Sequence, residues 1–308
     1  MQKILIFGIG GFAGKYLAQE FLNNGYDVIG SDIVQPKNLQ HNVSFYKCNL
    51  LEYDNVSKLI NNLLPDMIVN LAAISSVATS WNIPQMTMSV NVIGALNILE
   101  AAKLSKKMPK IMFVGSSEEY SASEFPLNEE YKLNSSNPYG ISKVTQEIFA
   151  KLYRDQYGMK IYCVRPFNHT GVGQSDSFVL PSFCKQVAAI EKSKMSGVIK
   201  VGNLTAKRDF SDVRDIVRAY RMVIESNDCT KIYNVGSGKA YSLQSLLDYI
   251  ISLSSQKISV EIDSERLRPI DNMYICCDNT SIRSDLGWDP QYCIYNAISD
   301  IYNYYLSL

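Results

Sequence analysis

Histidine is scarce in this sequence, with only His41 and His169 among 308 residues. This leaves little room for a histidine-ligated metal ion. The seven cysteines form no C-x-x-C pair and show no zinc-like spacing. An odd number of unpatterned thiols, without a leader of the signal-peptide type, predicts reduced cysteines in a cytoplasmic protein without a metal site.

An excess of either charge is also missing, because 30 lysines and arginines balance 30 aspartates and glutamates. This balance argues against a nucleic-acid or membrane surface as a partner. No apolar run approaches the roughly 20 residues needed to span a bilayer. The hydrophobic fraction of 46% and charged fraction of 19% are typical of a globular protein. A chain of this length can bury a large core, as one big domain or two modest ones.

The first 32 residues carry the strongest local pattern. The apolar run 4–7 predicts a parallel strand that is buried on both faces. Gly8, Gly11 and Gly14 follow at a sharp turn, and apolar residues then recur at helical spacing. The N–H groups at the start of that helix can hold a pyrophosphate. A second strand ends at Asp32, whose carboxylate suits ribose hydroxyls and repels a 2′-phosphate. Together these features predict a dinucleotide site.

Strand and helix patterns alternate through the first half, which predicts a parallel sheet with helices on both faces. The second strand is expected at residues 26–31, further strands at 42–48, 67–73, 110–115, 160–166 and 232–238, and later helices at 88–103, 138–157, 243–254 and 294–305. After Pro166 the alternation loosens, and the glycine-rich residues 168–177 are predicted to form a loop.

The predicted fold class is therefore α/β, a doubly wound parallel sheet with a smaller, interwoven α/β lobe. No repeat or low-complexity linker separates the two parts. The dinucleotide-binding domain is expected to comprise residues 1–168 plus about 210–238, and the substrate lobe about 169–209 plus 239–308.

Tyr139 and Lys143 are four residues apart behind Pro138, so they share one face of a predicted helix. A tyrosine hydroxyl with a pKa near ~10 is a poor acid–base group at neutral pH. A neighbouring ammonium group and an oxidised nicotinamide ring would lower that pKa. Taken alone, the pair also fits an ordinary surface helix, because the chain contains 20 tyrosines.

Ser116 strengthens the catalytic interpretation of this pair. It follows the strand predicted at 110–115, at the edge of the sheet where ligands bind in open α/β folds. There its hydroxyl could donate a hydrogen bond to a substrate carbonyl that gains negative charge. The alternative is a polar loop with capping serines.

These residues together resemble the extended short-chain dehydrogenase/reductases that act on nucleotide sugars. The family's glycine motif falls on Gly8, Gly11, Phe12 and Gly14, and its Ser–Tyr–Lys triad on Ser116, Tyr139 and Lys143. Within the family, the segments at 72–81, 115–120, 165–174, 202–210 and 267–269 look most like those of GDP-4-keto-6-deoxy-mannose reductases.

The resemblance implies a Rossmann fold and a role for each matching residue. Ser116 would bind the C4 oxygen, Tyr139 would exchange its proton, and Lys143 would hold the nicotinamide ribose. The implied cofactor-binding residues are Gly8, Gly11, Phe12, Gly14, Asp32, Asn49, Leu50, Leu71, Ala72, Ala73, Tyr139 and Lys143. The implied substrate-binding residues are Ser75, Glu118, Asn168, Val179, Lys185, Asn203, Arg208 and Arg268. His169 is interpreted as a structural loop residue.

The expected activity is NAD(P)H-dependent reduction of a GDP-4-keto-6-deoxyhexose at C4, in deoxysugar synthesis. Asp32 favours NAD(H), although such reductases often use NADP(H) and Lys37 could partly counter the aspartate. Asn49 replaces a common aspartate near the adenine, but its amide oxygen can still accept a hydrogen bond. The expected partner is a nucleoside-diphosphate sugar, and the resemblance implies a homodimer packed through the helix that carries Tyr139.

Several other functions remain open at this point. Glu118 stands where GDP-mannose 4,6-dehydratases, which look similar here, use a glutamate as the base for the C5 proton. An NAD-dependent C4 oxidase or an epimerase is a third possibility within the family. A catalytically silent sensor of NAD(H) or a nucleotide sugar is less consistent with the sequence, because both Tyr139 and Lys143 are present.

Overall fold

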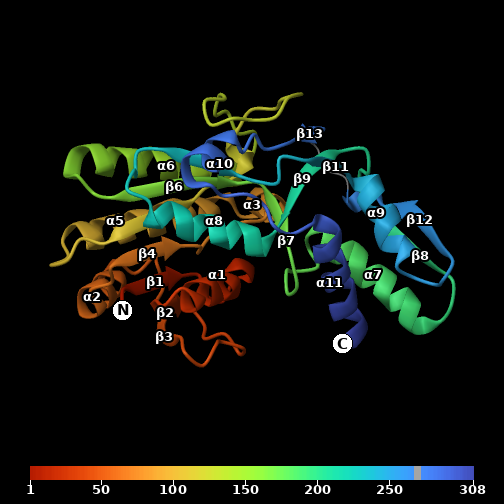
Figure 1. Cartoon of the computed structure of the whole chain (residues 1–308), viewed down its shortest axis with the longest axis horizontal. Coiled ribbons are helices and arrows are strands. Elements are labelled where there is room, and N and C mark those ends of the chain that lie inside the picture. Colours follow the sequence, from red (N-terminus) through yellow and green to blue (C-terminus); the bar gives the residue numbers. More distant parts are fainter. Residues whose placement is uncertain (267–271) are drawn as a thin grey trace.

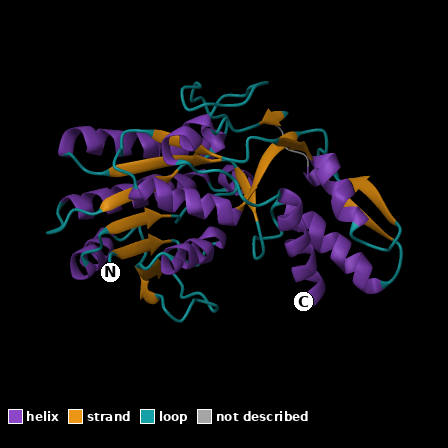
Figure 2. Cartoon of the chain, in the orientation of Figure 1, coloured by secondary structure: helices purple, strands orange, loops and turns teal. Residues whose placement is uncertain are grey.

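A seven-stranded parallel sheet lies at the centre of the larger part of the structure (Figures 1 and 2). The structure is a computed structural model that describes residues 1–266 and 272–308. The strand order of this sheet is β10-β6-β5-β4-β1-β2-β3. These strands are β1 (Lys3–Phe7), β2 (Asp27–Asp32), β3 (Ser44–Lys47), β4 (Met67–Asn70), β5 (Lys110–Val114), β6 (Ile161–Pro166) and β10 (Ile232–Val235). The order reverses between β1 and β4, so the sheet is doubly wound, as the sequence predicts.

Helices cover both faces of this sheet, which explains why the first strand is apolar throughout. Ile4 and Ile6 belong to one core cluster with residues of α1 (Phe12–Asn23) and α8 (Val213–Glu225). Leu5 and Phe7 point the other way. They join a second cluster with residues of α2 (Tyr53–Leu63), α5 (Gly94–Lys103) and α6 (Pro138–Tyr157).

A smaller lobe lies beside the sheet (Figure 1). Its four-stranded sheet contains β7 (Asn168–Thr170), β9 (Lys207–Asp212), β11 (Ala240–Ser242) and β13 (Tyr274–Ile275). A two-stranded sheet pairs β8 (Gly197–Val201) with β12 (Ile258–Ile262). The helices of this lobe, which share a third apolar cluster, are α7 (Val179–Ser193), α9 (Leu243–Ser252) and α11 (Ile294–Ser307).

The predicted strands of the large sheet are confirmed, but the predicted loop at 168–177 is wrong at its start. Residues 168–170 form β7 because they pair in parallel with β9, about forty residues later in the chain. Of the small lobe, the sequence predicts helices α9 and α11 but not its strands or helix α7. The remaining short elements are α3 (Val77–Asn82), α4 (Pro84–Met88), a π-helical segment η1 (Ser89–Ile93), the 3₁₀ turns η2 (Ser117–Glu119) and η3 (Ser264–Arg266), and α10 (Thr280–Leu286).

No helix within the described ranges is both long enough and apolar enough to cross a membrane. Across residues 1–266 and 272–308, histidine, cysteine and carboxylate side chains nowhere gather in threes around a potential metal position.

Candidate active site

Four neighbouring strands of the large sheet deliver the predicted site residues to one edge. In the order β5-β4-β1-β2, their carboxyl ends lead directly into Gly115, Leu71 and Gly8 and end at Asp32. The strands are parallel and adjacent in register, so these ends lie side by side. Ligands of open α/β sheets bind at such an edge, next to the reversal in strand order.

The glycine turn after β1 has no room for side chains. Gly8 has a φ of +79°, and a Cβ there would lie 2.5 Å from the backbone nitrogen of Ala72. A Cβ on Gly14 would lie 2.4 Å from the carbonyl oxygen of Ile9. Helix α1 then begins without a side-chain cap. The turn therefore presents bare backbone and an uncapped helix start, which fits a dinucleotide pyrophosphate.

Asp32 is held firmly at the end of β2. One carboxylate oxygen accepts the N–H of Gly10 at 3.0 Å and the other accepts the N–H of Ile33 at 2.7 Å. This places a fixed negative charge beside the glycine turn, where the ribose of a bound adenosine would lie. The residues present therefore fit a nicotinamide dinucleotide.

The other predicted cofactor residues lie along the same edge. The N–H of Leu71 bonds to the carbonyl of Phe7 at 2.9 Å, and the N–H of Ala72 bonds to Asn70. The amide oxygen of Asn49 already accepts the N–H of Leu51 at 3.1 Å. The Asn49 oxygen thus has one lone pair left for an adenine amino group.

Ser116, Tyr139 and Lys143 converge where β5 meets helix α6, and all three are buried. The Lys143 ammonium donates to the carbonyl oxygen of Val114, the last residue of β5, at 2.6 Å. Its Nζ lies 5.9 Å from the centre of the Tyr139 ring. Pro138 opens the helix and Asn137 caps it by accepting the N–H of Gly140 at 2.9 Å. The helix therefore begins where the sequence predicts, and this start determines the direction in which Tyr139 and Lys143 point.

Burial controls the charges of this group. It raises the pKa of Tyr139 well above its ordinary value, although a hydrogen bond with the Ser116 side chain opposes the rise. It lowers the pKa of Lys143 to about 8, against the opposing charge of Glu119. Burial therefore favours the protonated phenol of Tyr139. The expectation that Lys143 and an oxidised nicotinamide ring together lower this pKa concerns the protein with its cofactor bound, so it stays a prediction.

Glu118 lies in η2 between Ser116 and Tyr139. Its carboxylate accepts the side-chain N–H of Asn137 at 2.8 Å, and its backbone N–H donates to the Ser116 hydroxyl at 3.1 Å. The Glu118 side chain is half-buried. It is thus a carboxylate tethered to the start of the helix that carries Tyr139.

Asn91, in the π-helical segment η1, ties this helix to the loop that follows β4. Its amide accepts the N–H of Ile74 at 2.8 Å and donates to the Ser142 hydroxyl at 2.8 Å. Ser142 in turn donates to the carbonyl of Tyr139 at 2.6 Å. This chain of bonds fixes the distance between the cofactor edge and the tyrosine.

The predicted substrate residues lie mainly in the small lobe. Asn168 and Arg208 stand on the paired strands β7 and β9, and Asn203 lies between β8 and β9. Val179 and Lys185 are on α7, while Ser75 is exposed after β4. Arg268 lies outside the described residues. The structure thus divides the predicted substrate residues between the sheet edge and the second lobe.

A cavity of about 480 Å³ lies along α7. Its lining includes Asp176, Ser182, Lys185, Gln186 and Arg266. Lys185 pairs with Asp176 at 2.5 Å, and the guanidinium of Arg266 reaches the Ser182 hydroxyl at 3.3 Å. The volume and the mixed charges suit one part of a nucleotide.

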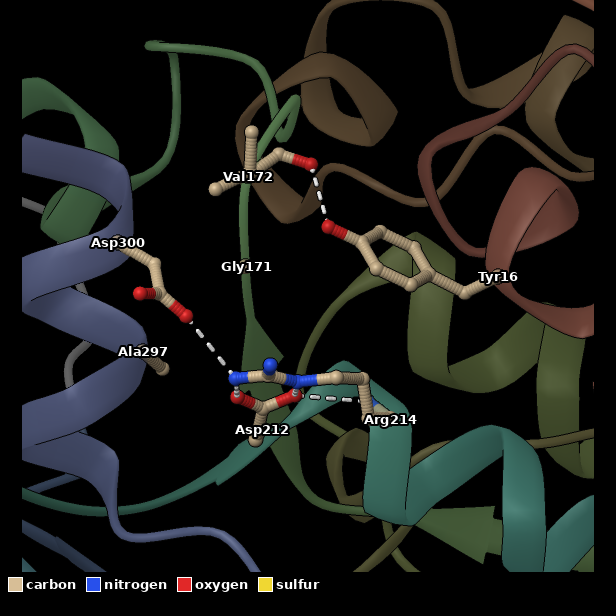
Figure 3. Close-up of a pocket in the computed structure, with 7 residues that line it drawn as sticks. All are labelled: Tyr16, Gly171, Val172, Asp212, Arg214, Ala297 and Asp300. Atoms are coloured by element: carbon tan, nitrogen blue, oxygen red, sulfur yellow. Dashed lines mark hydrogen bonds and ion pairs between the residues drawn. The ribbon is translucent and has the colours of Figure 1, made fainter. Parts of the chain in front are cut away.

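A second, smaller cavity of about 100 Å³ marks the junction of the two lobes (Figure 3). The Tyr16 hydroxyl of α1 donates to the carbonyl of Val172 at 2.8 Å. Arg214 of α8 makes two bonds to Asp212, of 2.9 and 2.6 Å, and one of 3.1 Å to Asp300 of α11. Because these charges pair with one another, we interpret this cavity as a structural seam, that is, a packing contact between the lobes and not a ligand site.

Three residues near the triad were not predicted: Asn137, Asn91 and Glu119. Asn137 could have been found, because an asparagine before a proline is a common helix cap. Glu119 stands three residues after Ser116, which is the spacing of a capping box. Asn91 begins the segment 91–94, which matches a motif of the family that the sequence resembles, but its role depends on contacts between distant segments.

Comparison with known proteins gives one family. A family model described as GDP-mannose 4,6 dehydratase matches residues 5–301. A GDP-6-deoxy-D-mannose reductase from Pseudomonas aeruginosa is 27% identical over 303 residues, which are 97% of this chain and 96% of that protein. GDP-mannose 4,6 dehydratase 2 from Arabidopsis thaliana is 29% identical over 309 residues, covering 93% of this chain and 82% of the relative.

Solved structures show the same fold over the whole chain. RMD from Pseudomonas aeruginosa, complexed with NADPH, has a TM-score of 0.87 and 26% identity, covering 100% of this chain and 99% of its own. A UDP-glucose 4-epimerase from Thermotoga maritima, with UDP-glucose, has a TM-score of 0.89 and 24% identity, and each chain is 99% covered. At that identity the second likeness concerns the fold alone.

Proposed function

The chain belongs to the GDP-mannose 4,6 dehydratase family of extended short-chain dehydrogenase/reductases, and on that premise we propose that it reduces a GDP-4-keto-6-deoxyhexose at C4. It is a nucleotide-sugar oxidoreductase that modifies GDP-sugars. The narrower proposal concerns the direction of the reaction and the position on the sugar.

The observation that carries the proposal is the buried Tyr139 beside Ser116 and Lys143, in a place where burial favours the protonated phenol. Reducing a ketone requires a hydride and a proton at one carbonyl group, and a bound nicotinamide cofactor supplies the hydride. Ser116 would donate a hydrogen bond to the C4 oxygen as negative charge develops there. Tyr139 would then give its proton to that oxygen. Lys143 would orient the cofactor ribose and stabilise the tyrosinate that remains.

The small lobe supports a nucleoside diphosphate as the other half of the substrate. The cavity along α7 offers the ammonium of Lys185 and the guanidinium of Arg266. Asn168 and Arg208 lie on the neighbouring strands β7 and β9. Arginine binds phosphate through a fork of donors, so we propose Arg208 as a diphosphate ligand, with Asn168, Asn203, Val179 and Lys185 around the nucleotide.

For the cofactor we propose NAD(H). The fixed carboxylate of Asp32 would accept ribose hydroxyls and would repel the 2′-phosphate of NADP(H). The Pseudomonas relative was solved with NADPH, so the choice needs a direct test. Lys37 is exposed beyond the end of β2 and is the residue that could offset this repulsion.

A second candidate function is the dehydration of GDP-mannose. It is favoured by Glu118, whose tether to Asn137 holds a carboxylate close to Tyr139. A base at this place could remove a proton next to a C4 ketone. A C4 oxidase or epimerase would use the same triad without that base.

The test offers purified protein GDP-4-keto-6-deoxy-mannose with NADH or with NADPH, and GDP-mannose alone. The proposal predicts that one equivalent of NADH is oxidised for each keto sugar consumed, faster than with NADPH. Turnover of GDP-mannose without added reductant would establish the dehydratase instead. No reaction in any of these mixtures would refute both.

We also propose a homodimer built on α6. The outer face of this helix exposes Ile141, Ile148 and Leu152, which are 48%, 60% and 52% accessible. Spacings of seven and four residues place them in one stripe, as in a helix that packs on a partner. Sedimentation should show a dimer, and Ile148→Asp should yield a monomer with an unchanged circular dichroism spectrum. A wild-type protein that sediments as a monomer would contradict this proposal.

A further inference from the structure

Glu119 is a fully buried acid directly beneath the catalytic serine. One of its carboxylate oxygens accepts the backbone N–H of Ser116 at 2.6 Å. Gly115 makes room for it, because a Cβ at that position would lie only 2.2 Å from the same oxygen. The Glu119 carbonyl also accepts the N–H of Asn134 at 3.0 Å. The acid is therefore built into the turn that presents the Ser116 hydroxyl.

The second oxygen of Glu119 is buried and has no hydrogen-bond partner within the part of the chain that the structure describes. Arg165 approaches it through Nε at 3.8 Å, beyond hydrogen-bond distance. That guanidinium already donates two hydrogen bonds to the Glu147 carboxylate, of 2.9 and 2.5 Å. When the carboxyl is ionised, a buried oxygen left in this way acts on its surroundings through its charge.

The groups that face this oxygen come from two elements. Lys143 and Glu147 lie on α6, and Arg165 lies on β6. Burial and the charge of Glu147 raise the pKa of Glu119 to about 8, against the opposing effects of Arg165, the Ser116 N–H and Lys143. Glu119 in turn favours the charged form of Lys143 and the protonated form of Tyr139.

We propose that Glu119 is a positioning residue for the triad. One oxygen fixes the peptide that carries Ser116, and the other places a titratable charge in the buried layer that holds Lys143 and Tyr139. The proposal rests on the oxidoreductase function proposed above, since it assigns Glu119 a task within that site. If the proposal is correct, removing the charge of Glu119 and removing its hydrogen bond to the Ser116 N–H will have different consequences.

Two variants separate these consequences. Glu119→Gln keeps an acceptor for the Ser116 N–H and removes the charge, whereas Glu119→Leu removes both. Glu129→Gln is the matched control, because Glu129 also accepts a backbone N–H, from Asn234 at 2.8 Å, and lies outside the triad. All three are compared with wild type by melting temperature, by hydrogen exchange at Ser116, and by the pH dependence of kcat and KM.

We expect Glu119→Gln to retain kcat near neutral pH within about threefold, and to lose activity on the alkaline side about one pH unit earlier than wild type. The shift follows because Lys143 then deprotonates more easily and Tyr139 loses its proton more easily. Glu119→Leu should lower kcat by about tenfold or more, with faster exchange at the Ser116 amide and little change in the KM for NADH. Glu129→Gln should leave the alkaline limb in place.

A measurement without cofactor checks the same assignment. The infrared spectrum of wild-type protein should contain a protonated-carboxyl band that disappears through about pH 8 and is absent from Glu119→Gln. An unchanged alkaline limb in Glu119→Gln, or normal kcat in a folded Glu119→Leu, would overturn the proposal. Inactive wild-type protein would instead count against the proposed function, while the infrared and exchange results would still decide the placement of Glu119.

Discussion

At the scale of single residues, burial decides which proton each group of this site carries. Tyr139 and Lys143 are four residues apart and share a helix face, as their spacing predicts. The same helix places them beneath the sheet edge, where the charged form of either group is disfavoured. Burial favours the protonated phenol and lowers the pKa of the ammonium to about 8. A protonated phenol is the state required of an acid that acts in reduction.

Replacing Tyr139 by phenylalanine removes the proposed acid and leaves the ring in place. We expect kcat to fall by at least about 10²-fold, because general acid catalysis contributes that much. NADH affinity, measured by fluorescence titration, should remain within about threefold, since the glycine turn and Asp32 are untouched. Near-normal turnover by this variant would show that another group supplies the proton.

Glu119 also makes stability depend on pH. Its pKa is raised to about 8 in the folded protein, from an ordinary value of 4.5. Between these values the folded state binds more protons than the unfolded state, so its contribution to stability falls as pH rises.

We expect wild type to lose stability relative to Glu119→Gln between about pH 5 and pH 8, by up to about 1.4 kcal/mol for each pH unit. In the lower part of this range Lys143 remains charged in the folded state of both proteins, so it does not mask the effect there. Urea unfolding of the two proteins at several pH values measures the difference. A difference that stays constant with pH would contradict the raised pKa.

At the scale of elements, the close approach of η2 to the start of α6 brings Ser116 and Tyr139 together. Gly140 permits it, because a Cβ there would lie 2.1 Å from the Ser135 hydroxyl and 2.2 Å from the carbonyl oxygen of Glu118. The Asn137 side chain bridges the same two elements. Catalytic geometry therefore depends on backbone packing as much as on the triad itself.

Gly140→Ala should push α6 away from η2 and lower kcat by about 10²-fold, because displacements near 1 Å have effects of that size. Gly158→Ala, at the other end of the same helix, is the control. Gly158 has a φ of +64°, and no atom lies within 4 Å of the position that a Cβ would take, so alanine should cost about 1 kcal/mol of stability and leave kcat unchanged. Equal effects of both substitutions on kcat would show that helix stability, and not packing against η2, matters.

At the scale of the whole molecule, a seam joins the cofactor domain to the small lobe. Lys15 and Tyr16 of α1 both donate to the carbonyl of Val172, each at 2.8 Å. On the other side of the cavity, Arg214 links the buried Asp212 to Asp300 of α11 (Figure 3). The division of the chain at the residues proposed above stays a prediction, but these contacts connect the glycine-turn helix to the substrate lobe.

Arg214→Ala should lower the free energy of unfolding by about 1–3 kcal/mol, because it leaves the buried carboxylate of Asp212 without its cation. Hydrogen exchange in α11 should accelerate. Asp300→Asn removes only the half-exposed partner and should cost less than about 1 kcal/mol. If both variants unfold at the same urea concentration as wild type, the seam does not stabilise the packing of the lobes.

The sequence by itself determined the features that depend on near neighbours in the chain. These are the strand, glycine turn, helix and acid of the first 32 residues, the facing of Tyr139 and Lys143, and the α/β class. Each follows from spacing along one segment. The assigned catalytic and binding roles stay predictions that the proposed experiments address.

Only the tertiary structure decided the rest. Strand β7 exists because Asn168–Thr170 pair with β9. Glu119 is buried because it packs against residues of α6 and β6. The raised pKa of Tyr139 has the same origin. Dielectric environment and strand pairing are set by segments far apart in the chain, so no local pattern of residues specifies them.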